Sequence, residues 1–529
     1  MAEKTVPTGI LHQFLLGNLK LCSEVGLKVG AIVCDQSTTN ASLYKLLGTG
    51  KEQPFFFYDN KKIFALFDVP HIFKNIRTNL MKYQISLPNH EGNANWTIIE
   101  ELYKLDSSSK TRVCPRLTHE HLSPNKFQKI NVRLALQILS KSTATGIQTM
   151  HGLRQFSENV KNDAMSTADF LLKINSLFDC LNSKSKFSPN PMNCALLKGN
   201  NIESYLKEMF EYISKIKYIV PSKKVNISCL TGLLQTISGV LQLSEELFSK
   251  FNDWTYLCTN KLNQDPLENL FGQIRYKKRN PNVLEFNDIM SRIASVRLLY
   301  ASKYGNCEDD CNEMLQLDWK AVVAEEGTQD IYFLQESQNS TQCCSGSISL
   351  EENYIEIENL VSNTTEESST STLSDNASRY FSGYIVHNKL KRGIGKNCNA
   401  CESDMLQENV LDTPSELLIQ FKNYNQFALK APNEPFFQMC KSHIQTFDKI
   451  FSSKSHIEGL KEKIVSECTE KYSSWYTPTS PCFAHRTEIL NFMILVLIRK
   501  NCLWEIDRIK LEEGKRERST NDRLNILLQ

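Results

Sequence analysis

Two apolar segments of this chain each end on an aspartate, and this pattern most restricts the fold. Residues 26–34 and 62–67 are rich in β-branched and aromatic residues, as buried strands are. Asp35 follows the first and Asp68 the second. Helical periodicity precedes the first strand and follows both, so the chain alternates helices and strands and belongs to the α/β class. Acids at the carboxyl ends of strands lie where an open α/β sheet places its chemistry.

The strand patterns disappear after about residue 96, where a helical insertion is expected. Four helices are predicted there, over residues 127–140, 167–181, 201–213 and 229–248. Residues 335–379 are rich in Ser, Thr, Asn and Glu, which is typical of a flexible linker. We therefore predict the α/β unit over 1–95, the insertion over 96–251, a return of the α/β unit over 252–334, the linker over 335–379, and a mainly α-helical C-terminal domain over 380–529.

Composition excludes some classes of protein. The formal net charge of +2 over 529 residues means that any surface for nucleic acid must be local. Seventeen cysteines without a signal peptide favour a reducing compartment, where close Cys pairs bind metals more often than they form disulfides. The longest apolar run, residues 489–498, is too short to cross a bilayer, so no membrane partner is expected.

A second acidic feature lies far along the chain, in the segment LNQDPLENLFGQIR. Asp265 and Glu268 are three residues apart, which places both carboxylates on one side of a short helix. An apolar stripe is expected beside them, facing the core, and consists of Leu267, Leu270, Phe271 and Ile274. Carboxylates at the rim of a core usually hold a metal, a proton or a cationic ligand.

Several ordered segments resemble the P-element-type transposase family, which includes the THAP-domain transposases. The matching segments read GLKVGAIVCDQSTTNASLYKLLG, KKIFALFDVPHIFKNIRTNL, LTHEHLSPNKFQKINVRLALQILS, INSLFDCLNS, LNQDPLENLFGQIR and YFSGYIVHNKLKRGIGKNCNAC. The resemblance implies a ribonuclease-H-like catalytic domain with an Asp-Asp-Glu triad, interrupted by a helical GTP-binding insertion. It assigns Asp35 as the second catalytic acid and Glu268 as the third, and both would hold Mg²⁺. Asp68 and His71 either support this site or form only a turn and a helix cap.

The same resemblance implies partners and a place of action. Its members cut and join transposon-end DNA in the nucleus, work as homo-oligomers and keep GTP as a bound cofactor. This chain has no GxxxxGK[ST] motif, so a phosphate-binding loop of the usual kind is not expected. The positions that match the family's nucleotide contacts are Lys129, Ile130, Asn131, Phe178, Asp179 and Asp265.

The chain also departs from the family pattern. The first catalytic Asp is expected before the helix predicted over residues 9–25, but no Asp precedes Asp35, and no N-terminal zinc finger is found. We therefore expect an N-terminally truncated, incomplete catalytic domain that is inactive by itself, either a fragment or a decayed copy. The alternative is a domesticated binding protein that keeps the GTP-binding insertion without catalysis. A GTP-hydrolysing switch is disfavoured by the missing phosphate loop.

A zinc site is expected in the last domain. Cys398 and Cys401 form a CxxC pair, and two CxxH pairs follow at Cys440 with His443 and at Cys482 with His485. One CxxC and one CxxH supply the tetrahedral ligand set of structural zinc. We favour the pair Cys482 and His485 because the family tends to place a CxxH at that position. Buried free cysteines remain the alternative.

Overall fold

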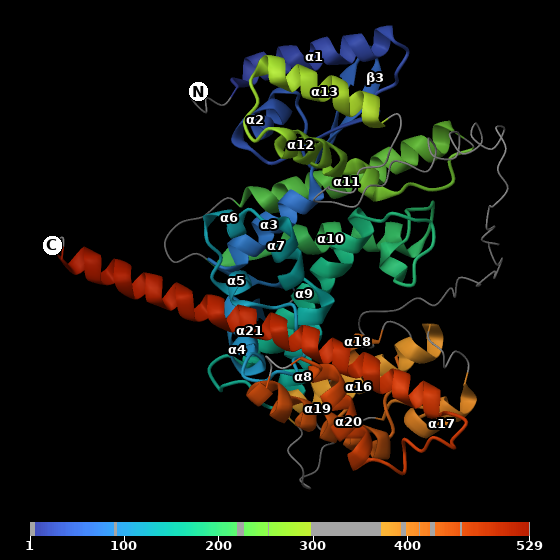
Figure 1. Ribbon diagram of the computed structural model, residues 1–529. Helices are drawn as coiled ribbons and strands as arrows, with labels where there is room; N and C mark the ends of the chain where they lie inside the picture. Colours follow the sequence, from blue (N-terminus) through green and yellow to red (C-terminus); the bar gives the residue numbers. More distant parts are fainter. Residues whose placement is uncertain are drawn as a thin grey trace.

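The computed structural model describes residues 6–297 and 372–527, except for 89–91, 220–226, 252, 393–397, 412, 424–428 and 455–457. These residues form a mixed α/β protein that is mostly helical (Figure 1). Most of the linker predicted over 335–379 lies outside the described residues. Its last part is helical, because α16 (Leu373–Arg392) begins there and buries Leu373 and Ala377.

A three-stranded sheet lies near the N-terminus. Strand β1 (Ala31–Cys34) pairs in parallel with β3 (Lys61–Phe67), and β2 (Phe55–Tyr58) pairs with the other edge of β3 in antiparallel fashion. Strand β1 is shorter than the predicted range 26–34, whereas β3 agrees with the predicted strand. Strand β2 was not predicted from the sequence. The signal for it was the adjacent pair Asp59 and Asn60, residue types that favour a tight hairpin turn, and both have positive φ in the structure.

Two helices flank this sheet early in the chain, α1 (Thr8–Glu24) and α2 (Thr38–Leu46). The residue that caps α2 is Ser37 and not the neighbouring Asn40. Ser37 is the N-cap, and its Oγ accepts a hydrogen bond from the backbone N–H of Asn40. The Asn40 side chain is thereby free to donate to Asp35.

The long helix α11 (Ser228–Lys250) packs on the sheet although it lies within the range predicted as the insertion. Thr236 Oγ1 accepts a hydrogen bond from Phe67 N and donates to Phe67 O, and Gln235 donates to Ala65 O. A Cβ at Gly239 would lie 2.3 Å from Leu66 Cδ2. The helix can approach β3 this closely because position 239 has no side chain.

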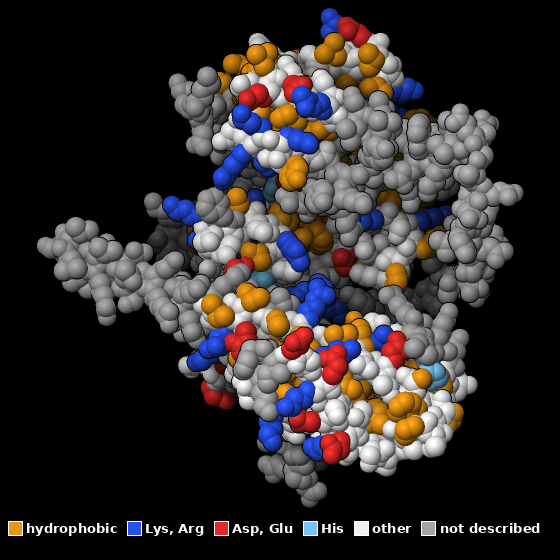
Figure 2. Space-filling view, viewed as in Figure 1, with side chains coloured by type: hydrophobic (Ala, Val, Ile, Leu, Met, Phe, Trp, Pro, Cys, Tyr) orange, Lys and Arg blue, Asp and Glu red, His pale blue; other side chains and the backbone are white. Residues whose placement is uncertain are grey.

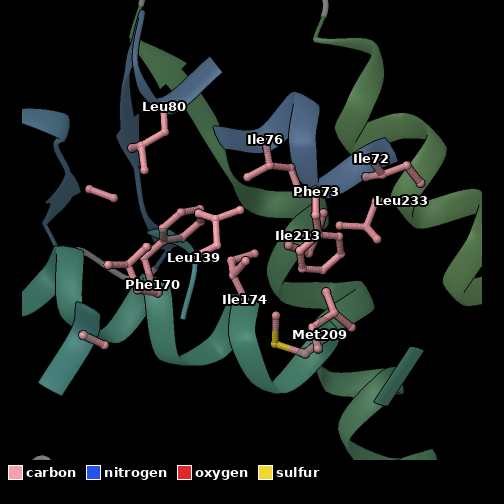
Figure 3. Close-up of a cluster of buried hydrophobic side chains, with 14 of the residues drawn as sticks. Ile72, Phe73, Ile76, Leu80, Leu139, Phe170, Ile174, Met209, Ile213 and Leu233 are labelled. Carbon is pink, nitrogen blue, oxygen red and sulfur yellow. The ribbon is translucent and has the colours of Figure 1, made fainter. Parts of the chain in front are cut away.

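The helix α3 (Val69–Leu80) connects the sheet to the insertion. Asp68 caps it and Pro70 occupies its first turn, both of which favour a helix start here. Its fully buried side chains, such as Phe73, meet residues of several other elements in one core (Figure 3). The labelled side chains in that view are Ile72, Phe73, Ile76, Leu80, Leu139, Phe170, Ile174, Met209, Ile213 and Leu233.

The insertion is built mainly from helices. They are α4 (Trp96–Asp106), α5 (His119–Leu122), α6 (Lys126–Lys129), α7 (Val132–Ile138), α8 (Lys141–Gly152), α9 (Lys161–Leu181), the short η2 (Pro191–Asn193) and α10 (Asn201–Lys215). A small antiparallel sheet joins β4 (Gln84–Ser86), β5 (Asn93–Ala94) and β6 (Lys217–Ile219).

The single helix predicted over 127–140 is wrong, because the chain breaks between α6 and α7. Asn131 starts the second helix by accepting a hydrogen bond from Leu134 N through its side chain.

The C-terminal unit has a hydrophobic core of its own. It contains α16, α17 (Asn399–Met405), α18 (Leu417–Lys422), α19 (Glu434–Lys454), α20 (Leu460–Lys471) and α21 (Phe483–Leu527). Helix α18 packs on α8, where a Cβ at Gly152 would lie 2.8 Å from Leu417 Cδ1. Figure 1 shows the long α21 crossing the molecule, and Trp504 on it donates to Ser107 O at the end of α4.

The unit around the N-terminal sheet is covered less completely than the insertion. Helix α1 exposes Phe14 at 61%, and Leu284 on α13 (Val283–Arg297) is 80% exposed. Figure 2 shows hydrophobic side chains on the surface over these helices. Among the described helices, none is both long and apolar enough to span a membrane.

Helix α3 should be a major determinant of stability. We predict that Phe73→Ala lowers the free energy of unfolding by about 3–5 kcal/mol, because Phe73 is fully buried and its removal leaves a cavity. Phe14→Ala removes the same side chain from the exposed face of α1 and should change stability by less than about 0.5 kcal/mol. Chemical denaturation of both variants tests this, and equal losses would contradict the central position of α3.

Candidate functional site

Asp35 lies directly after β1, at the carboxyl end of the sheet. Its Oδ1 accepts hydrogen bonds from Ser37 N at 3.0 Å and from Asn40 Nδ2 at 2.7 Å. Partial burial acts to raise the pKa of Asp35, but these hydrogen bonds and the nearby His71 outweigh it, so the pKa lies below its ordinary value. Asp35 is therefore held as an oriented carboxylate anion.

Asp68 occupies the equivalent place after β3, but it is committed to structural bonds. Its backbone N–H donates to Cys34 O, and its side chain is only 2% exposed. Oδ2 accepts from His71 N at 3.1 Å, and Oδ1 accepts from Gln264 N at 2.7 Å. Gln264 immediately precedes α12 (Asp265–Lys277), so Asp68 fixes the start of α12 against the start of α3.

His71 joins Asp68 to Glu268. Its Nδ1 lies 3.2 Å from Asp68 Oδ2, and its Nε2 lies 3.1 Å from Glu268 Oε1. Asp68 first and Glu268 second raise the pKa of His71 to about 9, against a smaller effect of burial. The His71 hydrogen bond in turn lowers the pKa of Glu268. At neutral pH, a protonated imidazole therefore lies between two carboxylates.

The two acids predicted as catalytic lie around the same cations. Charge from His71 lowers the pKa of Asp35 as well as that of Glu268. Burial lowers the pKa of Lys74, one turn further along α3, while Glu268 and Asp35 act in the opposite direction. The structure thus brings residues 35 and 268 together although a long insertion separates them in sequence. Their catalytic roles stay predictions.

Helix α12 differs in part from the predicted stripe. Ile274 is buried against Ile289 and Ile293 of α13, and Leu270 is partly buried. Leu267 and Phe271 are 44% and 38% exposed, so the prediction that they face the core is wrong. The reason is tertiary, because α12 packs along one narrow side on α13 and its acidic side faces α3. Asp265 begins the helix and is partly exposed.

Lys129, Ile130 and Asn131 lie at the junction of α6 and α7. All three are exposed, and Ile130 reaches 64%. The Lys129 carbonyl accepts a hydrogen bond from Arg77 Nη2 at 2.8 Å, which holds the junction against α3. All three predicted contacts thus lie at the surface, and Asn131 also caps α7.

Phe178 and Asp179 lie near the end of α9. Phe178 packs edge-on against Phe73 with ring centroids 5.1 Å apart. Asp179 Oδ2 accepts from Asn175 Nδ2 at 3.0 Å and from Asn190 Nδ2 at 2.8 Å. Burial raises the pKa of Asp179 against these two hydrogen bonds. The carboxylate is thus oriented within a small amide network.

The sequence patterns assign no role to Arg77, which lies on α3. The Arg77 side chain is fully buried, and burial lowers its pKa. Among the described residues, its Nε and Nη1 have no hydrogen-bond partner. A buried guanidinium with unpaired donors has unused capacity to bind an anion.

A separate group of ligand-type side chains lies in the C-terminal unit. Cys398, Cys401, Cys482 and His485 place their ligand atoms within 4.8 Å of one another, and no other group of this kind is found among the described residues. Cys440 is not part of this group.

The alternative CxxH pair has a different environment. His443 Nε2 lies 3.1 Å from the hydroxyl of Tyr476, and burial lowers the pKa of His443 to about 4. Cys440 is also buried, and its pKa is raised by burial to about 12. This pair therefore belongs to the hydrophobic core of the unit.

Parts of this chain are similar to known proteins. Residues 70–194 match the family model of the TNP-like GTP-binding insertion domain. The transposable element P transposase of Drosophila melanogaster is 28% identical over 264 residues, which cover 49% of this chain and 34% of that protein. This chain therefore spans about a third of the curated relative's length. The solved Drosophila P element transposase strand transfer complex is similar at 25% identity and a TM-score of 0.49, over 57% of this chain and 65% of that chain.

The bridge between α3 and α12 gives a titration test. We predict that His71 titrates with a pKa of about 9 and that Glu268→Gln lowers this pKa, since a neutral amide stabilises an imidazolium less than a carboxylate does. Histidine-selective NMR measures both values. Glu52→Gln removes an exposed carboxylate elsewhere and should leave the His71 pKa unchanged.

The same bridge makes stability depend on pH. The pKa of His71 is raised in the folded state from 6.5 to about 9, so its contribution is fully present below about pH 6.5 and is lost as pH rises through about 9. The wild-type protein should therefore lose more stability across this window than Glu268→Gln does. Identical pH profiles of the two proteins would show that the bridge does not form in solution.

Proposed function

We propose that this chain is a P-element-like DNA transposase chain of the P-element-type transposase family. In this proposal its sheet is part of a ribonuclease-H-like domain, its insertion binds GTP, and its acidic centre is of the Asp-Asp-Glu type. The observation that carries the proposal is the convergence of Asp35 and Glu268 around His71, from two elements far apart in sequence.

The acidic centre suits Mg²⁺ by its donor chemistry. Carboxylate oxygens are the ligands that Mg²⁺ prefers, and one or two per ion suffice when water fills the other positions. The hydrogen bonds from Ser37 N and Asn40 Nδ2 both go to Oδ1 of Asp35 and hold this carboxylate in place. Asp35 and Glu268 would hold the metal, which, when bound, stabilises negative charge on the oxygens of a phosphodiester during cleavage and strand transfer.

The neighbouring cations have a role of their own in this proposal. Without metal, His71 and Lys74 offset the charge of the two carboxylates. A DNA phosphate that approaches the acids also needs positive charge nearby, and these two side chains supply it from α3. Asp68 keeps His71 in place and lies too deep to serve as a metal ligand itself.

The centre contains fewer free carboxylates than two-metal chemistry requires. Of the three acids described around His71, Asp68 is occupied by bonds to His71 and Gln264, which leaves Asp35 and Glu268. Two acids anchor a pair of metal ions poorly. We therefore propose that this chain by itself binds without efficient catalysis, as a domesticated DNA- or protein-binding relative would.

The nucleotide site is proposed around α3. The Lys129 carbonyl meets this helix through Arg77, and Phe178 meets it through Phe73, so two segments of the insertion contact α3. Asp265 lies on α12, three residues before Glu268. Asp carboxylates suit the N–H donors of a guanine edge. The unpaired nitrogens of the buried Arg77 suit a phosphate.

The remaining partners follow from the same proposal. The chain would bind transposon-end DNA as a homo-oligomer, since two DNA ends must be brought together. Its place of action would be the nucleus, where this DNA is found.

Titration with nucleotide tests the insertion. We predict that the chain binds GTP with Mg²⁺ and that Asp179→Asn weakens binding roughly ten- to hundredfold, because a hydrogen bond to a charged group is lost. Asp169→Asn on the same helix α9 removes a carboxylate that pairs with Lys173 and should leave the affinity unchanged. Calorimetry measures both variants. Equal affinity for ATP and GTP, or no effect of Asp179→Asn, would contradict the guanine site.

DNA cleavage tests the acidic centre. The purified chain is incubated with Mg²⁺ and a plasmid that carries the repeats flanking its coding region, and gel electrophoresis follows strand breaks. We predict no cleavage above that of the double variant Asp35→Asn, Glu268→Gln. Cleavage by the wild-type chain that this variant loses would show that the acids suffice for catalysis.

A further inference from the structure

The four-residue Cys/His group lies where two helices of the C-terminal unit begin. Cys398 precedes α17 and Cys401 lies in its first turn, while Cys482 precedes α21 and His485 lies in its first turn. Each pair thus places two ligand atoms at one helix start, and the fold brings the two starts together. Cys401 and Cys482 are buried, whereas Cys398 and His485 are partly exposed.

The distances within this group match tetrahedral coordination. Cys398 Sγ and Cys482 Sγ are 3.8 Å apart, and Cys401 Sγ lies 3.5 Å from His485 Nδ1. With zinc–sulfur bonds of about 2.3 Å and zinc–nitrogen bonds of about 2.0 Å, a tetrahedron separates two sulfurs by about 3.8 Å and sulfur from nitrogen by about 3.5 Å. The observed contacts agree with both values.

We propose that Cys398, Cys401, Cys482 and His485 bind one structural Zn²⁺ ion that fastens the start of α21 to α17. The ligand set of three thiolates and one imidazole fills all four positions, so no position remains for substrate or catalytic water. The proposal concerns architecture and is independent of GTP and of catalysis.

A disulfide does not account for this arrangement. Sulfurs in a disulfide are about 2.05 Å apart, and the cysteines of this group are all free thiols in the structure. A disulfide would also leave His485 without a reason to point its Nδ1 at Cys401. Four convergent donors are the pattern of a metal site.

Neighbouring contacts strengthen the same junction. Arg486 Nη2 lies 2.7 Å from Asp404 Oδ2, which links α21 to α17 beside the proposed metal. Arg486 Nη1 also donates to Trp475 O, and its guanidinium lies over the Trp475 ring. Since α21 continues to Trp504 and its bond to Ser107 O, fixing its start also orients the helix against the insertion.

Zinc content is the first measurement. The chain purified without chelator should contain one zinc ion per molecule by plasma mass spectrometry. Cys482→Ser should lose it, because a hydroxyl is a poor zinc ligand. Cys502→Ser, an exposed thiol further along α21, is the matched control and should keep one zinc.

Cobalt substitution is measured on the wild-type protein, so its outcome does not depend on the folding of a variant. Wild-type chain refolded with Co²⁺ should show the intense visible and near-ultraviolet bands of tetrahedral thiolate coordination, and added Zn²⁺ should remove them. Chelation of the metal should lower the melting temperature of the wild-type protein and leave Cys482→Ser unaffected. Absence of zinc together with no cobalt bands, or a disulfide within the group found by mass spectrometry, would overturn the proposal.

Discussion

The bridge from Asp68 through His71 to Glu268 is the constraint on which the acidic centre depends. Asp68 ends β3, caps α3 and accepts the backbone N–H of Gln264, so one carboxylate fixes three segments. Its low exposure keeps water from competing for these bonds. Because α12 starts where Asp68 holds it, Glu268 one turn later meets His71. The chain closes the α/β unit after the insertion through this contact.

Helix α3 connects the acidic centre to the insertion. One side carries His71 toward the acids, and its apolar positions enter the core shown in Figure 3. Arg77, near its end, holds the junction of α6 and α7. The candidate metal and nucleotide sites therefore share one rigid element.

The C-terminal unit joins this assembly mainly through packing. Leu417 of α18 packs against Gly152 of α8, and Trp504 of α21 bonds to the end of α4. The unit's own core and the proposed zinc site make its helices a body that can dock on the insertion as a whole. Its Cys/His group lies at the starts of α17 and α21, whereas the acidic centre lies on α3 and α12. The two groups are therefore structurally separate.

Local patterns in the sequence determined the strand before Asp35, the strand before Asp68, the long helices and the pairs with close spacing, because these depend on neighbours along the chain. The choice of Ser37 and not Asn40 as the cap of α2, and the presence of strand β2, were not predicted. Both depend on local backbone geometry, which the hydrophobic periodicity does not report. Tertiary structure alone decided that Asp68 is buried and structural and that Leu267 and Phe271 stay exposed, whereas the grouping of Cys482 with Cys398 is the one that the sequence favoured. Burial and pairing between distant segments are set by which surfaces pack together, and that is a property of the folded chain.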